Sequence, residues 1–222
     1  MDYRYEIKIP ISKYNKSILT NFLFSLRNLR KDNEDREVNN VYFDTLNYYS
    51  AKSNLDGLSY RLKYRARWYE KNHVKSKCNV EFKIKNNKLN SKLVFGTNLH
   101  SSEIKKKKFF DLIKRDLYKT KIIDKNLLIQ DLFPIVQNRY KRKYFRYNDS
   151  IRLTYDTNIK FKNIKTNSIN NWYEDHLDVL EIKFDQKKME EAMKFIHKVP
   201  FVPKRHSKYL RGLSLCKIAL YI

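Results

Sequence analysis

The chain has 222 residues, of which 41% are hydrophobic and 14% aromatic, so we expect a single domain, residues 1–222, with a sizeable core. Its two cysteines, Cys78 and Cys216, exclude a disulfide framework and a cysteine metal site. No apolar run approaches the roughly 20 residues of a membrane span, and the charged stretch MDYRYEIKIP is unlike a signal peptide. We therefore expect a cytoplasmic protein that contacts membranes only peripherally or through a partner.

The net charge sets a second constraint. A formal charge of +24 implies an anionic partner, because self-repulsion of this size opposes the compact state. The candidates are a nucleic acid, an anionic membrane surface and a polyphosphate compound. A composition biased towards Lys, Asn and Ile is an alternative source of the bulk charge, but it leaves regular alternation within strands unexplained.

Apolar residues at every second position predict strands, and apolar residues at helical spacing predict helices. In chain order the patterns predict a strand over 3–9, a helix over 13–29, strands over 37–44, 59–69 and 80–85, a helix over 102–132, strands over 136–147, 150–160 and 178–184, and helices over 187–198 and from Ser207 onwards. Ser12 and Ser207 are the expected helix caps. With tight turns expected at 56–57 and 148–149, the class is α+β with mostly antiparallel strands.

One face of the third predicted strand is fully cationic. In SYRLKYRARWY, residues 59–69, every second position is basic: Arg61, Lys63, Arg65 and Arg67. A single such strand usually has one face in water, but other predicted strands of this chain repeat the pattern. Same-face neighbours about 6.6 Å apart repel by about 2.5 kcal/mol at an effective dielectric near 20. A concave surface built from these faces is therefore unstable unless a polyanion fills it.

Two architectures fit this pattern. An open sheet would leave the cationic faces in water. A closed antiparallel β-barrel would turn them inward and form a wet cationic tunnel, with helices packed outside to cover the apolar faces. We favour the closed barrel.

A few acids stand on the cationic faces, each two residues before a lysine. The pairs are Glu6 and Lys8, Glu81 and Lys83, and Glu181 and Lys183. Such carboxylates serve either as salt-bridge partners or, together with substrate phosphates, as ligands of Mg²⁺ or Mn²⁺. For Glu81 both readings stay open.

Motifs of other phosphate and metal chemistries are missing from the sequence. It contains no Gly-rich phosphate loop, no GxGxxG, no HExxH and no zinc spacing. Its five histidines do not cluster, and His206 alone lies beside a suspected site residue.

At this point the motifs resemble a known family. In order, RYEIKI, VYFDT, RARWYE, VEFKIK, YKRKYF, IRLTYDTNI, VLEIKF and HSKYLRG are similar to those of the polyphosphate polymerase domain of the vacuolar transporter chaperone (VTC) complex. That domain is one of the triphosphate tunnel metalloenzymes. The resemblance covers about residues 4 to 212 and implies an antiparallel barrel that holds a triphosphate or polyphosphate chain.

The resemblance also implies site residues. The catalytic cations would be Lys8, Arg65, Arg67, Lys83, Arg142 and Arg152, and the substrate-binding residues would be Tyr140, Lys183, Ser207 and Lys208. Lys63, outside the matched motif, is expected to line the approach. Glu181 would hold the metal with Glu6. The wider superfamily opens with ExExK, whereas Arg4 replaces the first acid here, which weakens the case for two metal-binding carboxylates in that strand.

The function that these observations favour is a metal-dependent polyphosphate polymerase. It would transfer the terminal phosphoryl group of ATP to a growing inorganic polyphosphate chain, with Mn²⁺ or Mg²⁺ as cofactor and ATP and polyphosphate as partners. An alternative is hydrolysis of an inorganic or organic triphosphate in the same tunnel. A second alternative is a non-catalytic polyanion- or nucleic-acid-binding module; nucleic acid is the less favoured partner, because a closed tunnel excludes bases and the acids repel a bare backbone.

Overall fold

The computed structural model describes residues 4–71, 74–75, 78–97, 99, 101–104, 107–112, 131–165 and 171–219. In chain order its elements are β1 (Tyr5–Ser12), η1 (Lys13–Asn15), α1 (Lys16–Ser25), β2 (Leu29–Asp44), α2 (Tyr49–Leu55), β3 (Tyr60–Lys71), β4 (Val74–Lys75), β5 (Cys78–Asn86), β6 (Leu89–Thr97), α3 (Ser101–Ile104), β7 (Phe133–Tyr147), β8 (Ile151–Asn163), β9 (Tyr173–Glu174), β10 (Leu177–Phe184), η3 (Gln186–Lys188), α5 (Met189–Lys198) and α6 (Lys208–Leu215).

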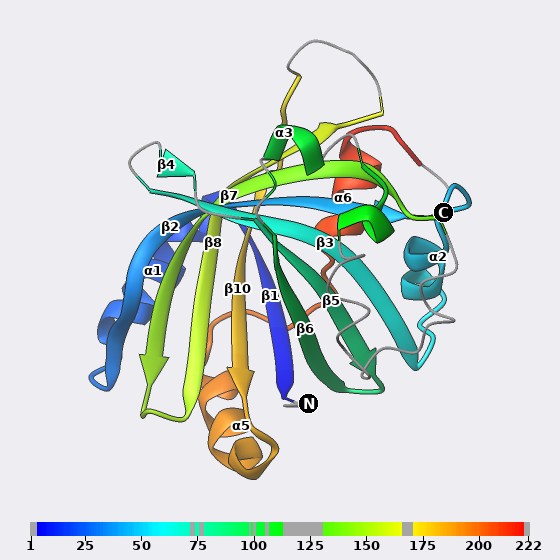
Figure 1. Ribbon diagram of the computed structural model, residues 1–222. Coiled ribbons are helices and arrows are strands. Elements are labelled where there is room, and N and C mark those ends of the chain that lie inside the picture. Colours follow the sequence, from blue (N-terminus) through cyan, green and yellow to red (C-terminus); the bar gives the residue numbers. More distant parts are fainter. Residues whose placement is uncertain are drawn as a thin grey trace.

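The strands form one ten-stranded antiparallel sheet with the order β1-β10-β8-β7-β2-β3-β5-β6, and β4 and β9 pair at its side. The sheet is strongly curved: β2, β3 and β7 run across the view while β8, β10, β1, β6 and β5 descend from them (Figure 1). This arrangement confirms the α+β class and the antiparallel pairing.

Closure of the predicted barrel is seen at a single point. The two edge strands, β1 and β6, meet at one antiparallel bridge, in which Arg4 and Asn90 exchange backbone hydrogen bonds of 3.1 and 3.0 Å. Within the described ranges no longer ladder joins these strands. The structure therefore establishes a curved sheet whose edges touch at one point. Within the described residues it does not show a continuous barrel wall.

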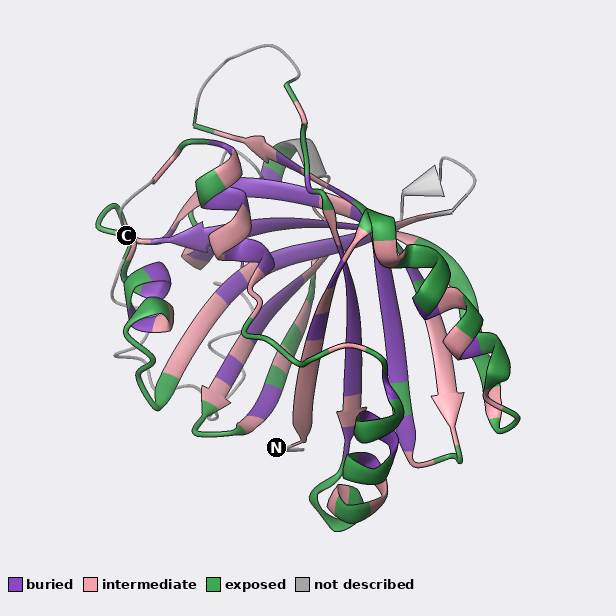
Figure 2. Cartoon of the chain, turned by 180° about the vertical axis from the view of Figure 1, so that it is seen from behind, coloured by how far each residue is buried: buried purple, intermediate pink, exposed green. Residues whose placement is uncertain are grey.

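Helices cover the outer, apolar face of the sheet, as the sequence predicts. Helices α1 and α5 pack on β1, β8 and β10, where Leu19 and Phe195 meet Ile9 and Leu180 in one core cluster. Seen from behind, these helices are exposed on their outer side while the central strands are buried (Figure 2). Because the outer face is dry, the charged side chains of the strands are left on the concave face.

Helix α6 is fixed to the sheet by a buried carboxylate. Asp44, at the end of β2, accepts a 2.7 Å hydrogen bond from the Tyr209 hydroxyl of α6 and is fully buried. The same carboxylate accepts backbone N–H bonds from Ser50 and Ala51 at the start of α2. One acid thus sets the position of both helices at this end of the sheet.

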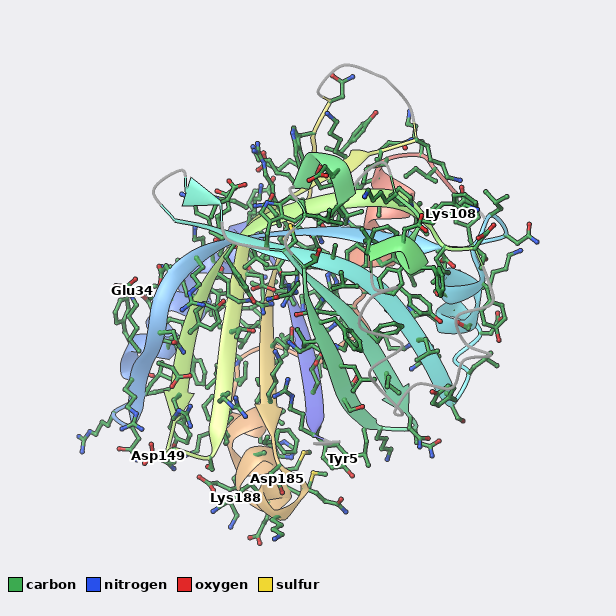
Figure 3. The ribbon with its side chains drawn as sticks, viewed as in Figure 1. Tyr5, Glu34, Lys108, Asp149, Asp185 and Lys188 are labelled. Carbon is green, nitrogen blue, oxygen red and sulfur yellow. The ribbon has the colours of Figure 1, made fainter. Side chains whose placement is uncertain are left out.

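The predicted turn at Asn148 and Asp149 joins β7 to β8, and both residues have positive φ angles, 46° and 57°. Two successive left-handed residues are what a tight hairpin turn requires. Asp149 lies at the outer tip of this hairpin, and Glu34 and Lys188 are also peripheral (Figure 3). These charges stand away from the concave face.

Several predicted boundaries need correction. The helix predicted over 13–29 ends at Ser25, because Leu29 already pairs with Tyr147 in the β2–β7 ladder. That ladder also extends β2 back to Leu29, well before the predicted start at 37. Strand β6 and helix α2 were not predicted. Of the helix predicted over 102–132, residues 105–106 and 113–130 lie outside the described residues.

None of the described helices combines the length and the apolar character that a membrane-spanning segment needs.

Gly212 gives a test of how tightly α6 is packed. A Cβ atom at this position would lie 2.7 Å from Cδ1 of Phe161 and 3.2 Å from Cγ2 of Val136. We expect Gly212→Ala to lower the free energy of unfolding by about 1–3 kcal/mol through overpacking, although Ala is the better helix former by about 1 kcal/mol. The matched control is Gly96→Ala in β6, where no heavy atom lies within 4 Å. Urea unfolding of both variants measures the difference, and an equal effect in both would contradict the packing.

Candidate functional site

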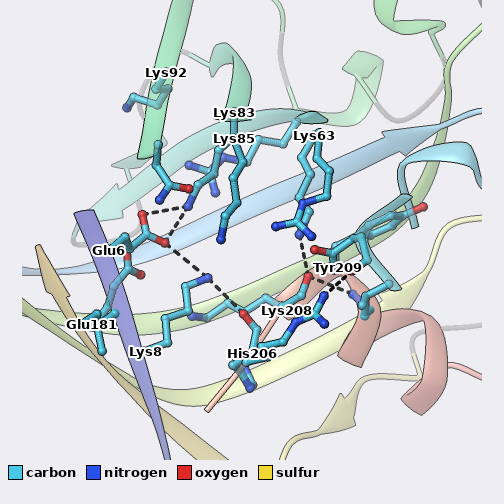
Figure 4. Close-up of a pocket in the computed structure, with 18 of the residues that line it drawn as sticks. Glu6, Lys8, Lys63, Lys83, Lys85, Lys92, Glu181, His206, Lys208 and Tyr209 are labelled. Atoms are coloured by element: carbon cyan, nitrogen blue, oxygen red, sulfur yellow. Dashed lines mark hydrogen bonds and ion pairs between the residues drawn. The ribbon is translucent and has the colours of Figure 1, made fainter. Parts of the chain in front are cut away.

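The concave face of the sheet encloses a cavity of about 750 Å³, within the range of small-molecule sites. We call this surface the lumen face; it carries alternate residues of the strands, including Glu6, Lys63, Arg65, Arg142 and Glu181. The segment 203–210 before and within α6 completes the wall. Lys and Arg far outnumber Glu around the cavity (Figure 4), so it is built for an anion.

Nearly all the predicted site residues meet in this cavity. Its lining includes Glu6, Lys8, Lys63, Arg65, Arg67, Lys83, Tyr140, Arg142, Glu181, Lys183, Ser207 and Lys208. Arg152 is not brought in. It is exposed near the start of β8, where it pairs in register with Arg146 and Lys183, and so it lies on the lumen face beyond the cavity.

Glu6 is the acid that links the two edge regions of the sheet. Its carboxylate accepts hydrogen bonds of 2.7 and 2.9 Å from Lys83 of β5 and lies 3.4 Å from Lys8 (Figure 4). Burial and the nearby Glu181 charge act to raise the pKa of Glu6, but Lys83, Lys8 and Lys183 outweigh them and lower it to about 2. Glu6 is therefore ionised at neutral pH.

Glu181 occupies the middle of β10, opposite Lys8 in register. It forms an ion pair of 2.8 Å with Lys183 and lies 3.9 Å from the guanidinium of Arg142. Burial acts to raise the pKa of Glu181, yet the surrounding lysines hold it well below its ordinary value. A second permanent negative charge therefore faces the cavity.

Glu81 is a salt-bridge partner, which was one of the two interpretations of its position. Arg65 donates from Nε to its Oε2 at 2.6 Å and forms an ion pair of 2.5 Å with the same oxygen through Nη2, and Lys92 donates to Oε1 at 3.1 Å. Burial acts to raise the pKa of Glu81, but these cations with Arg67 lower it below its ordinary value. Because both oxygens are engaged, Glu81 holds Arg65 in place.

Arg67 is held without an acid in direct hydrogen-bond contact. Its Nε donates to Asn40 at 2.7 Å and its Nη2 donates to the Tyr140 hydroxyl at 3.3 Å. Asn40 in turn donates to Asn138 at 2.7 Å. This chain of buried polar groups, contributed by β2, β3 and β7, fixes a guanidinium that is only 5% exposed.

Asp156 is a buried acid that holds two site cations and that the sequence analysis did not name as a site residue. Arg142 donates from Nε and Nη2 to its two oxygens at 2.6 and 2.7 Å, and Lys208 donates at 2.6 Å. Burial acts to raise the pKa of Asp156, but Arg142 and Lys208 lower it to about 2. Its signal was present in the motif IRLTYDTNI, since an acid four residues after Arg152 shares that residue's face.

The turn before α6 brings Ser207 and its neighbours to the cavity. Ser207 is the N-cap of α6, as predicted, and its hydroxyl accepts the N–H of Leu210 at 3.4 Å and a 2.9 Å bond from Lys63. Lys8 donates to the backbone oxygen of His206 at 3.2 Å. Burial, with Lys208 and Lys8 nearby, lowers the pKa of His206 to about 3, so its imidazole stays neutral.

The charged forms of two lysines are disfavoured by their surroundings. Burial lowers the pKa of Lys63 well below its ordinary value, and the neighbouring Lys8 and Lys83 act in the same direction. Burial also lowers the pKa of Lys83 to about 8, despite its bonds to Glu6. An anion in the cavity would favour the protonated form of both.

Glu6 and Glu181 are the two acids of the cavity lining that could hold a divalent cation. Both side chains are 6% exposed, line the same cavity and interact electrostatically. Mg²⁺ is usually held by one or two carboxylates together with substrate phosphates, so these two acids suffice only when a phosphate ligand is present. Among the described residues no group of three or more His, Cys, Asp or Glu could hold a metal by itself.

The family model of the VTC domain matches residues 3–217. The chain belongs to the VTC domain family. This match spans nearly the whole sequence and confirms the resemblance drawn from the ordered motifs. No curated protein sequence matches this VTC domain.

Solved structures share the fold of this VTC domain at low identity. A Pyrococcus horikoshii protein aligns over 96% of this chain and 99% of its own, with a TM-score of 0.54 and 11% identity. A Hippeastrum protein, described as a candidate adenylyl cyclase with a dominant triphosphatase activity, covers 95% of each chain with a TM-score of 0.53 and 13% identity. A candidate adenylate cyclase of Bacillus halodurans covers 95% of this chain and 98% of its own, with a TM-score of 0.52 and 17% identity. These likenesses establish the fold.

The depressed lysine pKa values predict proton uptake on anion binding. As pH rises through about 8, Lys83 loses its proton in the free protein. The pKa of Lys63 is lowered as well. A bound polyanion raises both pKa values, so affinity for inorganic tripolyphosphate is expected to fall as pH rises from about 7 to about 9.

Calorimetry in metal-free buffers of different ionisation enthalpy measures the protons taken up. Lys63→Arg, whose charge is permanent, should take up fewer protons than the native chain. Lys187→Arg on the exposed η3 is the matched control. Equal uptake by native and Lys63→Arg chains would show that Lys63 does not titrate with the ligand.

Proposed function

We propose that this VTC domain is a polyphosphate polymerase that transfers the terminal phosphoryl group of ATP to inorganic phosphate or to the end of a polyphosphate chain. The bond between the γ-phosphorus and the bridging oxygen of ADP breaks, and a bond from the γ-phosphorus to an acceptor phosphate oxygen forms. The observation that carries this proposal is the buried cationic cavity whose cations are fixed by internal acids. Family membership supports it.

The cations of the cavity suit phosphoryl transfer because this reaction needs little covalent help from the protein. Catalysis comes from in-line positioning and from neutralising charge on the equatorial oxygens. Arg65 and Arg142 are each held by a carboxylate through two guanidinium nitrogens. Their positions are set before the substrate arrives, so little reorganisation is needed during the reaction. Lys8 and Lys208 act as point charges beside them.

The acceptor requires no general base. A terminal phosphate oxygen is already anionic at neutral pH, so no proton has to be removed before it attacks. This agrees with the cavity, where His206 is neutral and buried and the nearby carboxylates are paired with cations. The residues position the acceptor and balance its charge.

The divalent cation would be held by Glu181 and Glu6. When bound together with substrate phosphates, Mg²⁺ or Mn²⁺ supplies further neutralisation of phosphate charge. The protein's own share is to keep both carboxylates ionised and facing the cavity, which the neighbouring lysines do.

The proposal includes a tunnel closed around the phosphate chain. The Arg4–Asn90 bridge and the ion pair between Lys83 and Glu6 already join the two edge regions of the sheet. A bound polyanion would add attraction for the cations on both sides of this seam.

Product analysis separates synthesis from hydrolysis. Hydrolysis would use the same cavity with water as the acceptor, and the Hippeastrum structure of the same fold comes from a protein described as a triphosphatase. Incubation with ATP and Mn²⁺ is expected to yield ADP and phosphate chains resolved by gel electrophoresis. Release of free phosphate alone would overturn the polymerase assignment and favour the triphosphatase.

Removal of one carboxylate tests the metal role. We expect Glu181→Gln to lower metal-dependent ATP turnover at least about 100-fold, because metal-based charge stabilisation amounts to several kcal/mol. Glu174→Gln is the matched control, since Glu174 is exposed and pairs with Lys13 away from the cavity. Urea unfolding midpoints show whether each variant is folded. Undiminished turnover in a folded Glu181→Gln chain would remove the assigned role.

A further inference from the structure

Beyond the cavity, the lumen face carries a group of aromatic and cationic side chains that we call the aromatic end: Arg36, Tyr69 and Tyr144. The guanidinium carbon of Arg36 lies 5.6 Å from the ring centre of Tyr69 and 6.0 Å from that of Tyr144. Arg36 is exposed and both tyrosines are half-buried. A register shift in β2 between Asn33 and Arg36 precedes this group, and such bulges often re-aim a side chain near functional sites.

The aromatic end continues the phosphate-binding surface. Tyr69 follows Arg67 by two residues on β3, and Tyr144 follows Arg142 by two residues on β7, so each tyrosine shares the face of its arginine. Arg36 is the direct register partner of Arg142. The aromatic end therefore lies next to any molecule whose phosphates contact Arg67 and Arg142. The two tyrosine rings are two residues further along the strands, and the Arg36 guanidinium is on the neighbouring strand.

The opposite end of the same strand face has a different character. Arg61, eight residues before Tyr69 on β3, lies about 26 Å from it along the strand and pairs in register with Lys85. Neither cation forms a salt bridge within the described part of the chain. The tyrosines that line the cavity itself are buried: Tyr42, Tyr140 and Tyr209. Part-exposed rings on the lumen face are thus found at the aromatic end.

We propose that the aromatic end binds the base of the nucleotide donor whose phosphates lie among Arg67 and Arg142. Base rings stack on tyrosine rings and on guanidinium planes with little dependence on base identity. The inference rests on the proposed function, because it takes a nucleoside triphosphate as the phosphoryl donor. It also gives the nucleotide a direction: the γ-phosphate points along β3 towards Arg61, and the acceptor chain approaches from that cationic end.

Two ligands that differ by the nucleoside test the proposal. Calorimetry in metal-free buffer compares the imidotriphosphate analogue of ATP, which is not hydrolysed, with inorganic tripolyphosphate. In Tyr144→Leu and in Tyr69→Leu the Kd of the analogue is expected to rise about tenfold, the size of one base–aromatic stack, while the Kd of tripolyphosphate stays within about twofold. Tyr60→Leu, on the opposite face of β3, is the matched control and should change neither Kd.

Three results would overturn the proposal. The first is an unchanged Kd of the analogue in both variants. The second is an equal loss of affinity for both ligands, which would indicate a purely structural role of the tyrosines. The third is no binding of the analogue to the native chain. Because these measurements record binding and not turnover, they are independent of the product assay. If the native chain makes no polyphosphate and Tyr144→Leu weakens binding of the nucleotide analogue alone, the polymerase is refuted and the base site is retained.

Discussion

The fold has to accommodate strong repulsion among the cations of the lumen face. At an effective dielectric near 20, two like charges 4 Å apart cost about 4 kcal/mol. The fold offsets this repulsion with buried carboxylates placed among the cations. These are Glu6, Glu81, Asp156 and Glu181, each 6% exposed or less at its side chain. Loss of one partner from such a pair leaves an uncompensated buried charge, which typically costs about 3–5 kcal/mol.

The same pairs prepare the surface for a phosphate chain. Arg142 is held by Asp156 and Arg65 by Glu81, so their guanidinium groups are placed before any ligand binds. Lys63 has a serine hydroxyl as its hydrogen-bond partner, and burial lowers its pKa. The site thus combines fixed cations with a lysine whose charge an incoming polyanion would restore. The same cations therefore lower the stability of the free protein and raise its affinity for a polyanion.

The parts of the fold that the sequence predicts well are those in which local pattern and tertiary contact agree. Strand alternation located the lumen face, and Ser207 was correctly expected to cap the last helix. Strand β6 was missed because its sequence LNSKLVFGT lacks clear alternation, yet pairing with β5 along its whole length makes it a strand. The helix predicted to run to residue 29 stops early because Leu29 gains a ladder partner in Tyr147. In both cases a partner distant in sequence overrides local propensity.

The character of the site can be read from the amino-acid sequence: a face of alternating Lys and Arg, a few acids on that face, and the ordered motifs of the VTC domain family. Side-chain alternation is a local property of a strand, so neighbours in sequence suffice to reveal it. The pairing of each acid with its cation depends on tertiary contacts, since Asp156 meets Lys208 from a separate helix and Glu6 meets Lys83 across the edges of the sheet. It also left Arg152 beyond the cavity and joined Arg36 to Tyr69 and Tyr144. Register and curvature bring these residues together, and both arise from contacts between strands far apart in the chain.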